Sequence, residues 1–223
     1  GWPYKVFVEN RSSSNLAFKI QGGGACWSHF TCFTLGTARG SIPNRLQESE
    51  GFSSDDESLS PISDYSYVYF PYCTGDVHLG KHATKYDGKD YYHNGRNNIE
   101  TAVDFLMDNE LVKPDQIEDF VLYGNSAGAL GALYHIANIA PYFEGAIRKT
   151  MILDAPGLHF GNGFWNNFTD ELFYDYSEAL GNIGLELSKD EGNIAAAVPL
   201  VCELNPDFEI GVLQTTRDRT MSW

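Results

Sequence analysis

Short apolar runs alternate with amphipathic stretches along most of this chain. Runs rich in β-forming residues predict strands at 16–20, 65–70, 120–123, 149–153 and 208–214. Between them, residues 97–109 carry apolar side chains at helical spacing, with Asn97 or Asn98 available as the N-cap, and residues 129–137 also predict a helix. Strands that alternate with helices indicate an α/β fold with a mostly parallel sheet and helices on both faces.

Residues 160–205 are less regular than the rest. This segment contains helical stretches and several aromatic residues. It has two interpretations, an insertion over the sheet and the active site, or aromatic residues that serve packing alone. Neither a linker nor an internal repeat divides the chain, so residues 1–223 predict a single domain.

Composition excludes some classes of partner. The 223 residues carry a formal net charge of −15, which disfavours binding to nucleic acid and to anionic membranes. No apolar run approaches the length of a membrane span. The four cysteines do not have a common zinc spacing, so we expect no metal site. Cys26–Cys32 is the favoured disulfide, with Cys32–Cys73 as its rival and buried free thiols as the third possibility.

The strongest chemical signal is the pentapeptide from Gly124 to Gly128, Gly-Asn-Ser-Ala-Gly, between a predicted strand and a predicted helix. A serine on such a turn exposes its hydroxyl above the sheet edge. It also lies at a helix N-terminus, where free N–H groups can stabilise an oxyanion. Ser126 is therefore the candidate nucleophile and the N–H of Ala127 a candidate oxyanion donor, against the alternative of an ordinary strand–helix turn.

Two loops that follow predicted strands supply further candidates. The first contains Gly23 and Gly24, whose bare backbone could approach a reacting carbonyl and donate N–H groups to the oxyanion; Trp27 follows them. The second contains Asp76 and His78. Because loops at the carboxyl ends of parallel strands build the site in such folds, we expect both residues at the substrate pocket. The simpler alternatives are a glycine turn and a local hydrogen bond.

Four pieces of this sequence resemble the pectin acetylesterase and Notum family of serine esterases. They are Gly-Gly-Gly-Ala-Cys-Trp at 22–27, Tyr-Cys-Thr-Gly-Asp-Val-His at 72–78, Gly-Asn-Ser-Ala-Gly at 124–128, and Asp218. The resemblance implies an α/β-hydrolase-like domain and the removal of acyl groups from oxygen. Gly24-Ala25 stand where the animal branch carries an aromatic pair, so the chain is more similar to the bacterial and plant type.

The sequence offers two candidates for the catalytic acid and no histidine in the usual position of the base. Asp218 is the favoured acid because the family pattern places it there, and Asp154 is the alternative. The usual order Ser…Asp…His requires a histidine after Asp218, and none follows in this sequence. We therefore expect that the chain lacks its C-terminal part. A base relocated to His78 or His159 and a catalytically inactive homologue are the other two interpretations.

The expected function is a serine carboxylic-ester hydrolase that removes O-acetyl groups from a polysaccharide such as pectin. Its expected partner is an acylated carbohydrate or another small ester, no cofactor is expected, and the expected location is secreted or otherwise extracytoplasmic. The alternatives are a non-catalytic carbohydrate-binding homologue, and a lipase- or thioesterase-type hydrolase acting on longer acyl chains.

Overall fold

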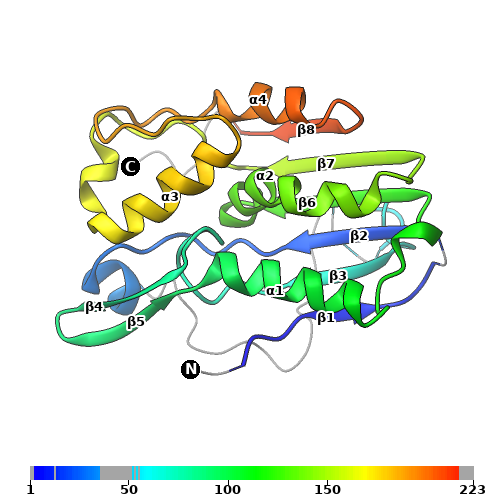
Figure 1. Cartoon of the computed structure of the whole chain (residues 1–223), viewed down its shortest axis with the longest axis horizontal. Coiled ribbons are helices and arrows are strands. Elements are labelled where there is room, and N and C mark those ends of the chain that lie inside the picture. Colours follow the sequence, from blue (N-terminus) through cyan, green and yellow to red (C-terminus); the bar gives the residue numbers. More distant parts are fainter. Residues whose placement is uncertain (1–2, 13, 36–51, 53, 55, 216–223) are drawn as a thin grey trace.

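The computed structural model describes residues 3–12, 14–35, 52, 54 and 56–215. Its main sheet has six strands in the order β1-β3-β2-β6-β7-β8 (Figure 1). β1 pairs antiparallel with β3, and every other pairing in this sheet is parallel. The strands are β1 (Phe7–Glu9), β2 (Asn15–Ile20), β3 (Ser66–Phe70), β6 (Asp119–Asn125), β7 (Arg148–Asp154) and β8 (Glu209–Leu213).

The remaining elements are helices and one hairpin. The α-helices of the described residues are α1 (Gly95–Asp108), α2 (Ala127–Ile139), α3 (Asp170–Asn182) and α4 (Ala197–Leu204). The shorter helices are η1 (Phe30–Thr34), η3 (Pro114–Gln116), η4 (Ala140–Phe143) and η5 (Phe164–Asn167), and the hairpin is β4 (His82–Tyr86) with β5 (Lys89–His93). None of the helices in the described part is long and apolar enough to cross a membrane.

All five strands predicted from the sequence are present, and so are both predicted helices. The helix predicted at 97–109 begins two residues earlier, at Gly95, and its N-cap is Asn94. The sequence analysis missed β1 and the β4–β5 hairpin. The hairpin had a signal, because Asp87 and Gly88 both adopt positive φ (51° and 79°), and Asp-Gly is a preferred pair for a two-residue hairpin turn.

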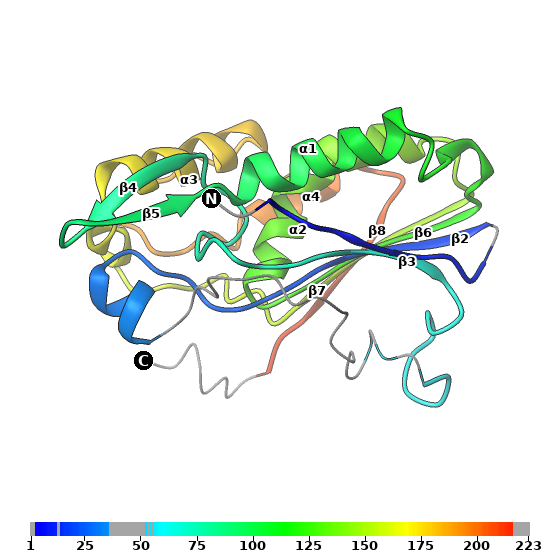
Figure 2. The same cartoon turned by 90° about the horizontal axis from the view of Figure 1, so that it is seen from below.

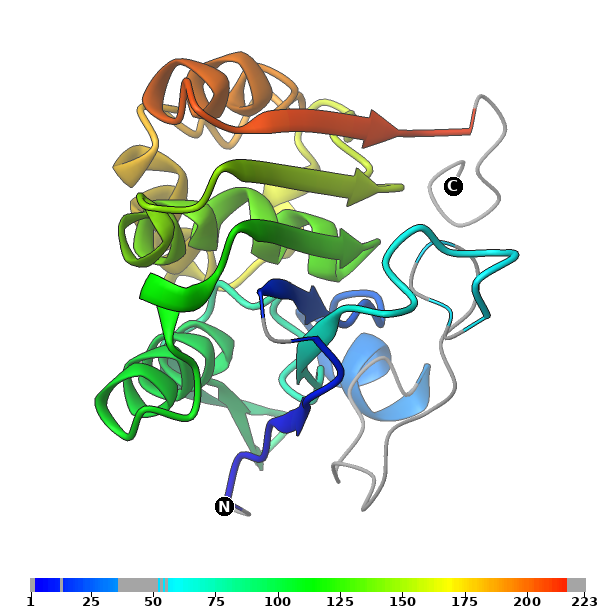
Figure 3. The same ribbon diagram turned by 90° about the vertical axis from the view of Figure 1, so that its right-hand side faces the viewer.

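The two faces of the sheet are covered differently. Leu16, Phe18 and Ile20 of β2 point into the larger core, where the apolar residues of α1, α2, α3 and α4 also pack. The alternate residue Ala17 belongs to a smaller cluster on the opposite face, together with Ile62 and Tyr123. Figures 2 and 3 show all four α-helices on one side of the sheet and residues 56–65 on the other. The mostly parallel α/β fold is therefore confirmed, and within the described residues its α-helices lie on one face of the sheet.

The carboxyl ends of the parallel strands lie together at one edge of the sheet. The arrows of β2, β6 and β7 point toward the β4–β5 hairpin and α3, which lie beyond that edge (Figure 1). The loops that follow β2, β3 and β6 contain the three motifs found in the sequence. The topology therefore brings these motifs to one edge of the sheet.

Candidate active site

Ser126 lies on a sharp turn between β6 and α2. Its backbone has φ 50° and ψ −121°, a conformation that non-glycine residues rarely adopt and that costs of order 1–3 kcal/mol. The Ser126 N–H donates to the carbonyl of Asp154 at 2.7 Å, which fixes the turn to the end of β7. The residue is half-buried and directly precedes the first turn of α2. Its hydroxyl therefore lies at a helix N-terminus, as the motif predicts.

The two glycines of the motif are required by close backbone contacts. A Cβ on Gly124 would lie 2.1 Å from the carbonyl oxygen of Gly128. A Cβ on Gly128 would lie 2.1 Å from the carbonyl oxygen of Ile20, the last residue of β2. Both distances are far below van der Waals contact. These glycines let α2 start directly against β6 and β2, which holds Ser126 in its strained conformation.

The glycine loop after β2 lies against the same turn. The Gly22 N–H donates to Oδ1 of Asn125 at 3.0 Å. A Cβ on Gly22 would lie 2.3 Å from the Asn125 carbonyl oxygen and 3.1 Å from Cβ of Ser126. The structure thus brings the loop that contains Gly23 and Gly24 beside Ser126. In the described part of the chain, the N–H groups of Gly23, Gly24 and Ala127 have no hydrogen-bond acceptor.

Tyr72 fastens the glycine loop to the loop that follows β3, and the sequence analysis did not single it out. Its phenol donates to the Gly24 carbonyl at 2.7 Å and accepts from the Val77 N–H at 2.8 Å. Its backbone N–H donates to Oε1 of Gln21 at 2.9 Å. A Cβ on Gly23 would lie 2.4 Å from Cδ1 of the Tyr72 ring. Its place in the Tyr-Cys-Thr-Gly-Asp-Val-His motif was the available signal.

Asp76 is fully buried, and its carboxylate accepts three hydrogen bonds. Oδ1 accepts from the Thr74 hydroxyl at 2.6 Å and from the His78 N–H at 3.1 Å. Oδ2 accepts from the N–H of Gly95, the first residue of α1, at 2.8 Å. Burial raises the pKa of Asp76 to about 6, although these hydrogen bonds oppose the shift. In this structure the side chain presents no surface to a ligand, and it holds the loop against α1.

His78 is also buried, and its ring contacts the glycine loop. Nε2 lies 2.8 Å from the Gln21 carbonyl oxygen, so the imidazole donates its N–H to that oxygen. The His78 carbonyl in turn accepts from Nε2 of His135 at 2.9 Å. Burial lowers the pKa of His78 to about 4, which keeps the ring neutral at pH 7. This residue therefore supports the loop before the three glycines, and its side chain is closed to solvent.

The Cys26–Cys32 disulfide, which the sequence analysis favoured over Cys32–Cys73, is confirmed. Cys73 is a free thiol, as is Cys202. The Cys26 N–H donates to the Gly75 carbonyl at 2.7 Å, which adds a second link between the two loops. Cys26, Cys32 and His93 place ligand atoms within 4.8 Å of one another, but the disulfide removes both sulfurs from metal binding.

Trp27 joins the glycine loop to the segment 160–205. Its ring stacks on Phe168 with centroids 5.6 Å apart and meets the edge of Phe164 at 5.5 Å. Phe164 stacks in turn on Phe160 at 4.6 Å. These half-buried and buried rings form an aromatic wall, defined by Trp27, Phe160, Phe164 and Phe168, next to the loop that follows β2.

Comparison with known proteins identifies the family. The sequence model described as Pectinacetylesterase matches residues 6–180. This chain belongs to the pectinacetylesterase family. It is also 28% identical over 159 residues to the palmitoleoyl-protein carboxylesterase NOTUM of Schmidtea mediterranea. That match covers 69% of this chain and 29% of the relative, so the chain spans less than a third of the relative's length.

The match to the pectinacetylesterase family covers Ser126 and both loops beside it. Of the two candidate acids, Asp154 lies inside the matched range and Asp218 lies outside it. Asp154 ends β7 inside the matched range, and its carboxylate accepts a hydrogen bond from the Tyr123 phenol at 2.9 Å. Asp218 lies outside the residues that the structure describes.

Neither His78 nor His159, the two alternative candidates for the base, is hydrogen-bonded to Ser126. The His78 Nε2–H donates to the Gln21 carbonyl. His159 is exposed, and its backbone forms an isolated β-bridge with Asn193. Among the described residues, no hydrogen bond joins the Ser126 hydroxyl to an imidazole. The described part of the chain therefore contains no histidine that is hydrogen-bonded to Ser126 as a general base would be.

Proposed function

We propose that this chain is a serine carboxylic-ester hydrolase that removes O-acetyl groups from a polysaccharide such as pectin. The observation that carries the proposal is the strained Ser126 turn, held between the end of β7 and the glycine loop. Strain at a half-buried serine between a strand and a helix is typical of a nucleophile elbow, because glycine would adopt the same backbone conformation at lower cost. Membership of the pectinacetylesterase family supports the same chemistry.

In the proposed reaction, Oγ of Ser126 attacks the ester carbonyl carbon while a general base takes its proton. The carbonyl oxygen becomes an oxyanion, which the N–H of Ala127 and the N–H of Gly23 or Gly24 stabilise. Collapse of this intermediate releases the sugar hydroxyl, which receives the proton, and leaves an acetyl group on Ser126. Water then attacks the acyl-enzyme with the same base, which frees acetate. We propose Asp218 as the acid that orients the base.

The unpaired N–H groups support the oxyanion assignment. Ala127 is the first residue of α2, so its N–H has no acceptor within the helix. Gly24 has a positive φ of 81°, and its carbonyl is held by Tyr72. This hydrogen bond anchors the peptide between Gly24 and Ala25, directly after the proposed donors, so the loop needs little reorganisation when charge develops.

Acyl-chain length distinguishes the main proposal from its competitor. The NOTUM relative is named for a palmitoleoyl group, which is long and apolar. A long acyl chain needs an apolar channel, whereas an acetyl group needs only a small pocket. The aromatic wall that includes Trp27 is therefore relevant to the length of the acyl group. We propose that the segment 160–205 lies over the active site through this wall and limits the acyl group to acetyl.

The disulfide supports an extracytoplasmic location. Cys26–Cys32 stays oxidised in secreted, periplasmic or luminal compartments and is reduced in most cytosols. We propose that the protein acts outside the cytoplasm, where acetylated polysaccharides are also found.

The decisive experiment compares Ser126→Ala with wild type in the full-length natural protein. We measure acetate release from acetylated pectin and hydrolysis of p-nitrophenyl esters of increasing chain length. Loss of the nucleophile lowers kcat by a factor on the order of a million, without loss of folding by circular dichroism. The matched control is Thr101→Ala, which removes an exposed hydroxyl on α1, outside the three motifs and outside the segment 160–205. A Ser126→Ala protein with near-wild-type turnover contradicts the proposal, and faster hydrolysis of long acyl esters than of acetate favours the competitor.

A further inference from the structure

Asn125, the residue directly before Ser126, has an exposed side chain at the proposed active site. It is the last residue of β6, and it is exposed whereas the six strand residues before it are buried. The Gly-x-Ser-x-Gly motif requires no particular residue type at this position. The nucleophile turn therefore does not explain why an amide side chain is found there.

The side-chain amide of Asn125 has a fixed orientation. Its Oδ1 accepts the Gly22 N–H at 3.0 Å, a contact between two segments that are far apart in the sequence. Because only the oxygen of an amide can accept from an N–H, this hydrogen bond determines which side of the amide carries Nδ2. Among the described residues, no group accepts a hydrogen bond from Nδ2. The acceptor of this amide is thus used within the protein, and its two N–H donors are not.

Nδ2 of Asn125 lies close to the side chain of Ser126. A Cβ on Gly22 would lie 3.0 Å from this Nδ2 and 3.1 Å from Cβ of Ser126, so both atoms are next to the same point of the glycine loop. The same loop continues into Gly23 and Gly24, whose N–H groups are the proposed oxyanion donors. An ester whose carbonyl carbon is held against Oγ of Ser126 therefore has its remaining atoms beside the Asn125 amide.

The chemistry of an amide N–H selects the half of the substrate that it can bind. Such a group donates to oxygen acceptors. The acetyl half of the ester offers only its carbonyl oxygen, which the proposed oxyanion donors bind, and a methyl group, which accepts nothing. The alcohol half is a sugar ring with several oxygens around the ester. The unused donors of Asn125 therefore match the alcohol half of an acetylated sugar.

We propose that Asn125 is a substrate-binding residue, whose Nδ2 donates a hydrogen bond to an oxygen of the sugar ring that carries the acetyl group. This inference rests on the proposed function, because it takes Ser126 as the nucleophile. The hydrogen bond from Gly22 holds the amide in its donating orientation before the substrate binds. A ring hydroxyl and the carboxylate of a uronic acid both offer an acceptor oxygen, and the test separates these two sources.

The test compares kcat/KM of the full-length natural protein for two acetyl esters, acetylated trigalacturonate and p-nitrophenyl acetate. The second has no sugar oxygens, so damage to the glycine loop lowers both values, whereas loss of a sugar contact lowers their ratio. We expect Asn125→Ala to lower the ratio of the sugar ester to the phenyl ester about tenfold, as for the loss of one hydrogen bond. Asn109→Ala is the matched control, since it removes an exposed amide at the C-cap of α1 and should leave the ratio unchanged. A wild-type ratio in Asn125→Ala overturns the proposal.

Asn125→Asp identifies the oxygen that Nδ2 contacts. This variant keeps an acceptor for the Gly22 N–H and replaces the two donors by a carboxylate. A sugar hydroxyl can donate to that carboxylate, so a ratio above that of Asn125→Ala assigns the contact to a hydroxyl. A uronate is repelled by it, so a ratio below that of Asn125→Ala assigns the contact to the sugar carboxylate.

A binding measurement separates failure of this inference from failure of the proposed function. Calorimetric titration with acetylated trigalacturonate is carried out on Ser126→Ala and on the Ser126→Ala, Asn125→Ala double variant. We expect the double variant to bind about tenfold more weakly. Equal binding, with an inactive Ser126→Ala protein, overturns the role of Asn125 alone. An active Ser126→Ala protein overturns the proposed function, and the inference with it.

Discussion

The phenol of Tyr123 donates a hydrogen bond to the carboxylate of Asp154 at 2.9 Å, between the neighbouring strands β6 and β7. The same aspartate accepts the Ser126 N–H through its backbone carbonyl at 2.7 Å. Asp154 therefore holds the Ser126 turn in place through its main chain, while its side chain accepts a hydrogen bond from Tyr123. This division bears on which carboxylate serves as the catalytic acid.

We predict that Asp154→Asn keeps most of the activity and that Asp218→Asn loses it. In the Asp154→Asn variant the side-chain amide oxygen still accepts from Tyr123, and the Ser126 N–H contact uses the backbone, which the substitution does not change. Loss of the acid of a catalytic triad typically lowers kcat by about 10⁴. Steady-state kinetics on p-nitrophenyl acetate check this. A large loss in Asp154→Asn with an active Asp218→Asn would reverse the assignment.

Tyr72→Phe should lower kcat more than it raises KM. The substitution removes the hydrogen bonds to the Gly24 carbonyl and from the Val77 N–H, so the peptide between Gly24 and Ala25, which directly follows the proposed oxyanion donors, loses its anchor. We expect a loss of about 10- to 100-fold in kcat and of about 1–3 kcal/mol in the free energy of unfolding, because the Val77 N–H is buried. Tyr4→Phe is the control, since its phenol donates to Pro71 outside the glycine loop. Equal effects of the two variants would refute the positioning role.

Gly128→Ala and Gly181→Ala should have opposite effects on stability. A Cβ at Gly128 meets the Ile20 carbonyl at 2.1 Å, so β2 and α2 must separate, which we expect to cost about 3 kcal/mol or more and to abolish activity. Gly181 lies in α3 with open space around its Cβ, so alanine there should stabilise by about 0.5–1 kcal/mol. Urea unfolding followed by fluorescence measures both. Destabilisation by Gly181→Ala, or tolerance of Gly128→Ala, would count against the packing described.

Stability should fall as the pH drops from 6.5 toward 4.5. Burial lowers the pKa of His78 and His93 to about 4 and that of His135 to about 3, whereas an unfolded histidine titrates near 6.5. In this window the unfolded chain binds more protons than the native protein, so acid favours unfolding. Asp76 acts in the opposite direction, because its pKa is raised to about 6 and the native protein gains its proton first.

Urea unfolding at pH 7.0, 5.5 and 4.5 measures the balance. Three histidines against one carboxyl predict a net loss on the order of several kcal/mol at pH 4.5. Asp76→Asn removes the opposing titration, so its stability should fall more steeply with acid than that of wild type. A free energy of unfolding that stays constant or rises toward pH 4.5 would contradict the burial of these imidazoles.

The sequence by itself determined the order of most strands and helices and the turn at Ser126, and it favoured the Cys26–Cys32 disulfide. These features are local. Alternating apolar runs set β2, β3, β6, β7 and β8, the Gly-x-Ser-x-Gly spacing sets the turn at Ser126, and the sequence separation of Cys26 and Cys32 is 6. The hairpin of β4 and β5 was missed because its strands are polar and short, although Asp87-Gly88 signalled its turn.

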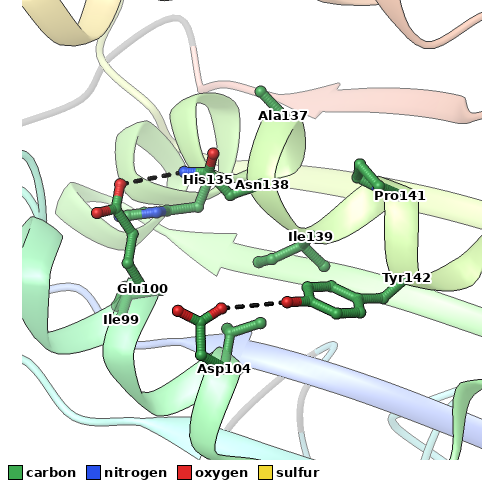
Figure 4. Close-up of a pocket in the computed structure, with 10 residues that line it drawn as sticks. Ile99, Glu100, Asp104, His135, Ala137, Asn138, Ile139, Pro141 and Tyr142 are labelled. Carbon is green, nitrogen blue, oxygen red and sulfur yellow. Dashed lines mark hydrogen bonds between the residues drawn. The ribbon is translucent and has the colours of Figure 1, made fainter. Parts of the chain in front are cut away.

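Only the tertiary structure decided what the polar residues of the loops do. Asp76 and His78 are residue types that often line a pocket, but both side chains are buried. The Asp76 carboxylate accepts hydrogen bonds from three donors, and the His78 imidazole donates to the Gln21 carbonyl. Tyr72 gained its role from contacts with Gly24 and Val77, and the first of these lies far away in sequence. The groove between α1 and α2, which Glu100 and His135 line, also has no sequence pattern, because it forms where two helices meet (Figure 4). Burial and partner choice depend on packing between distant segments, and a local pattern of residues does not contain that information.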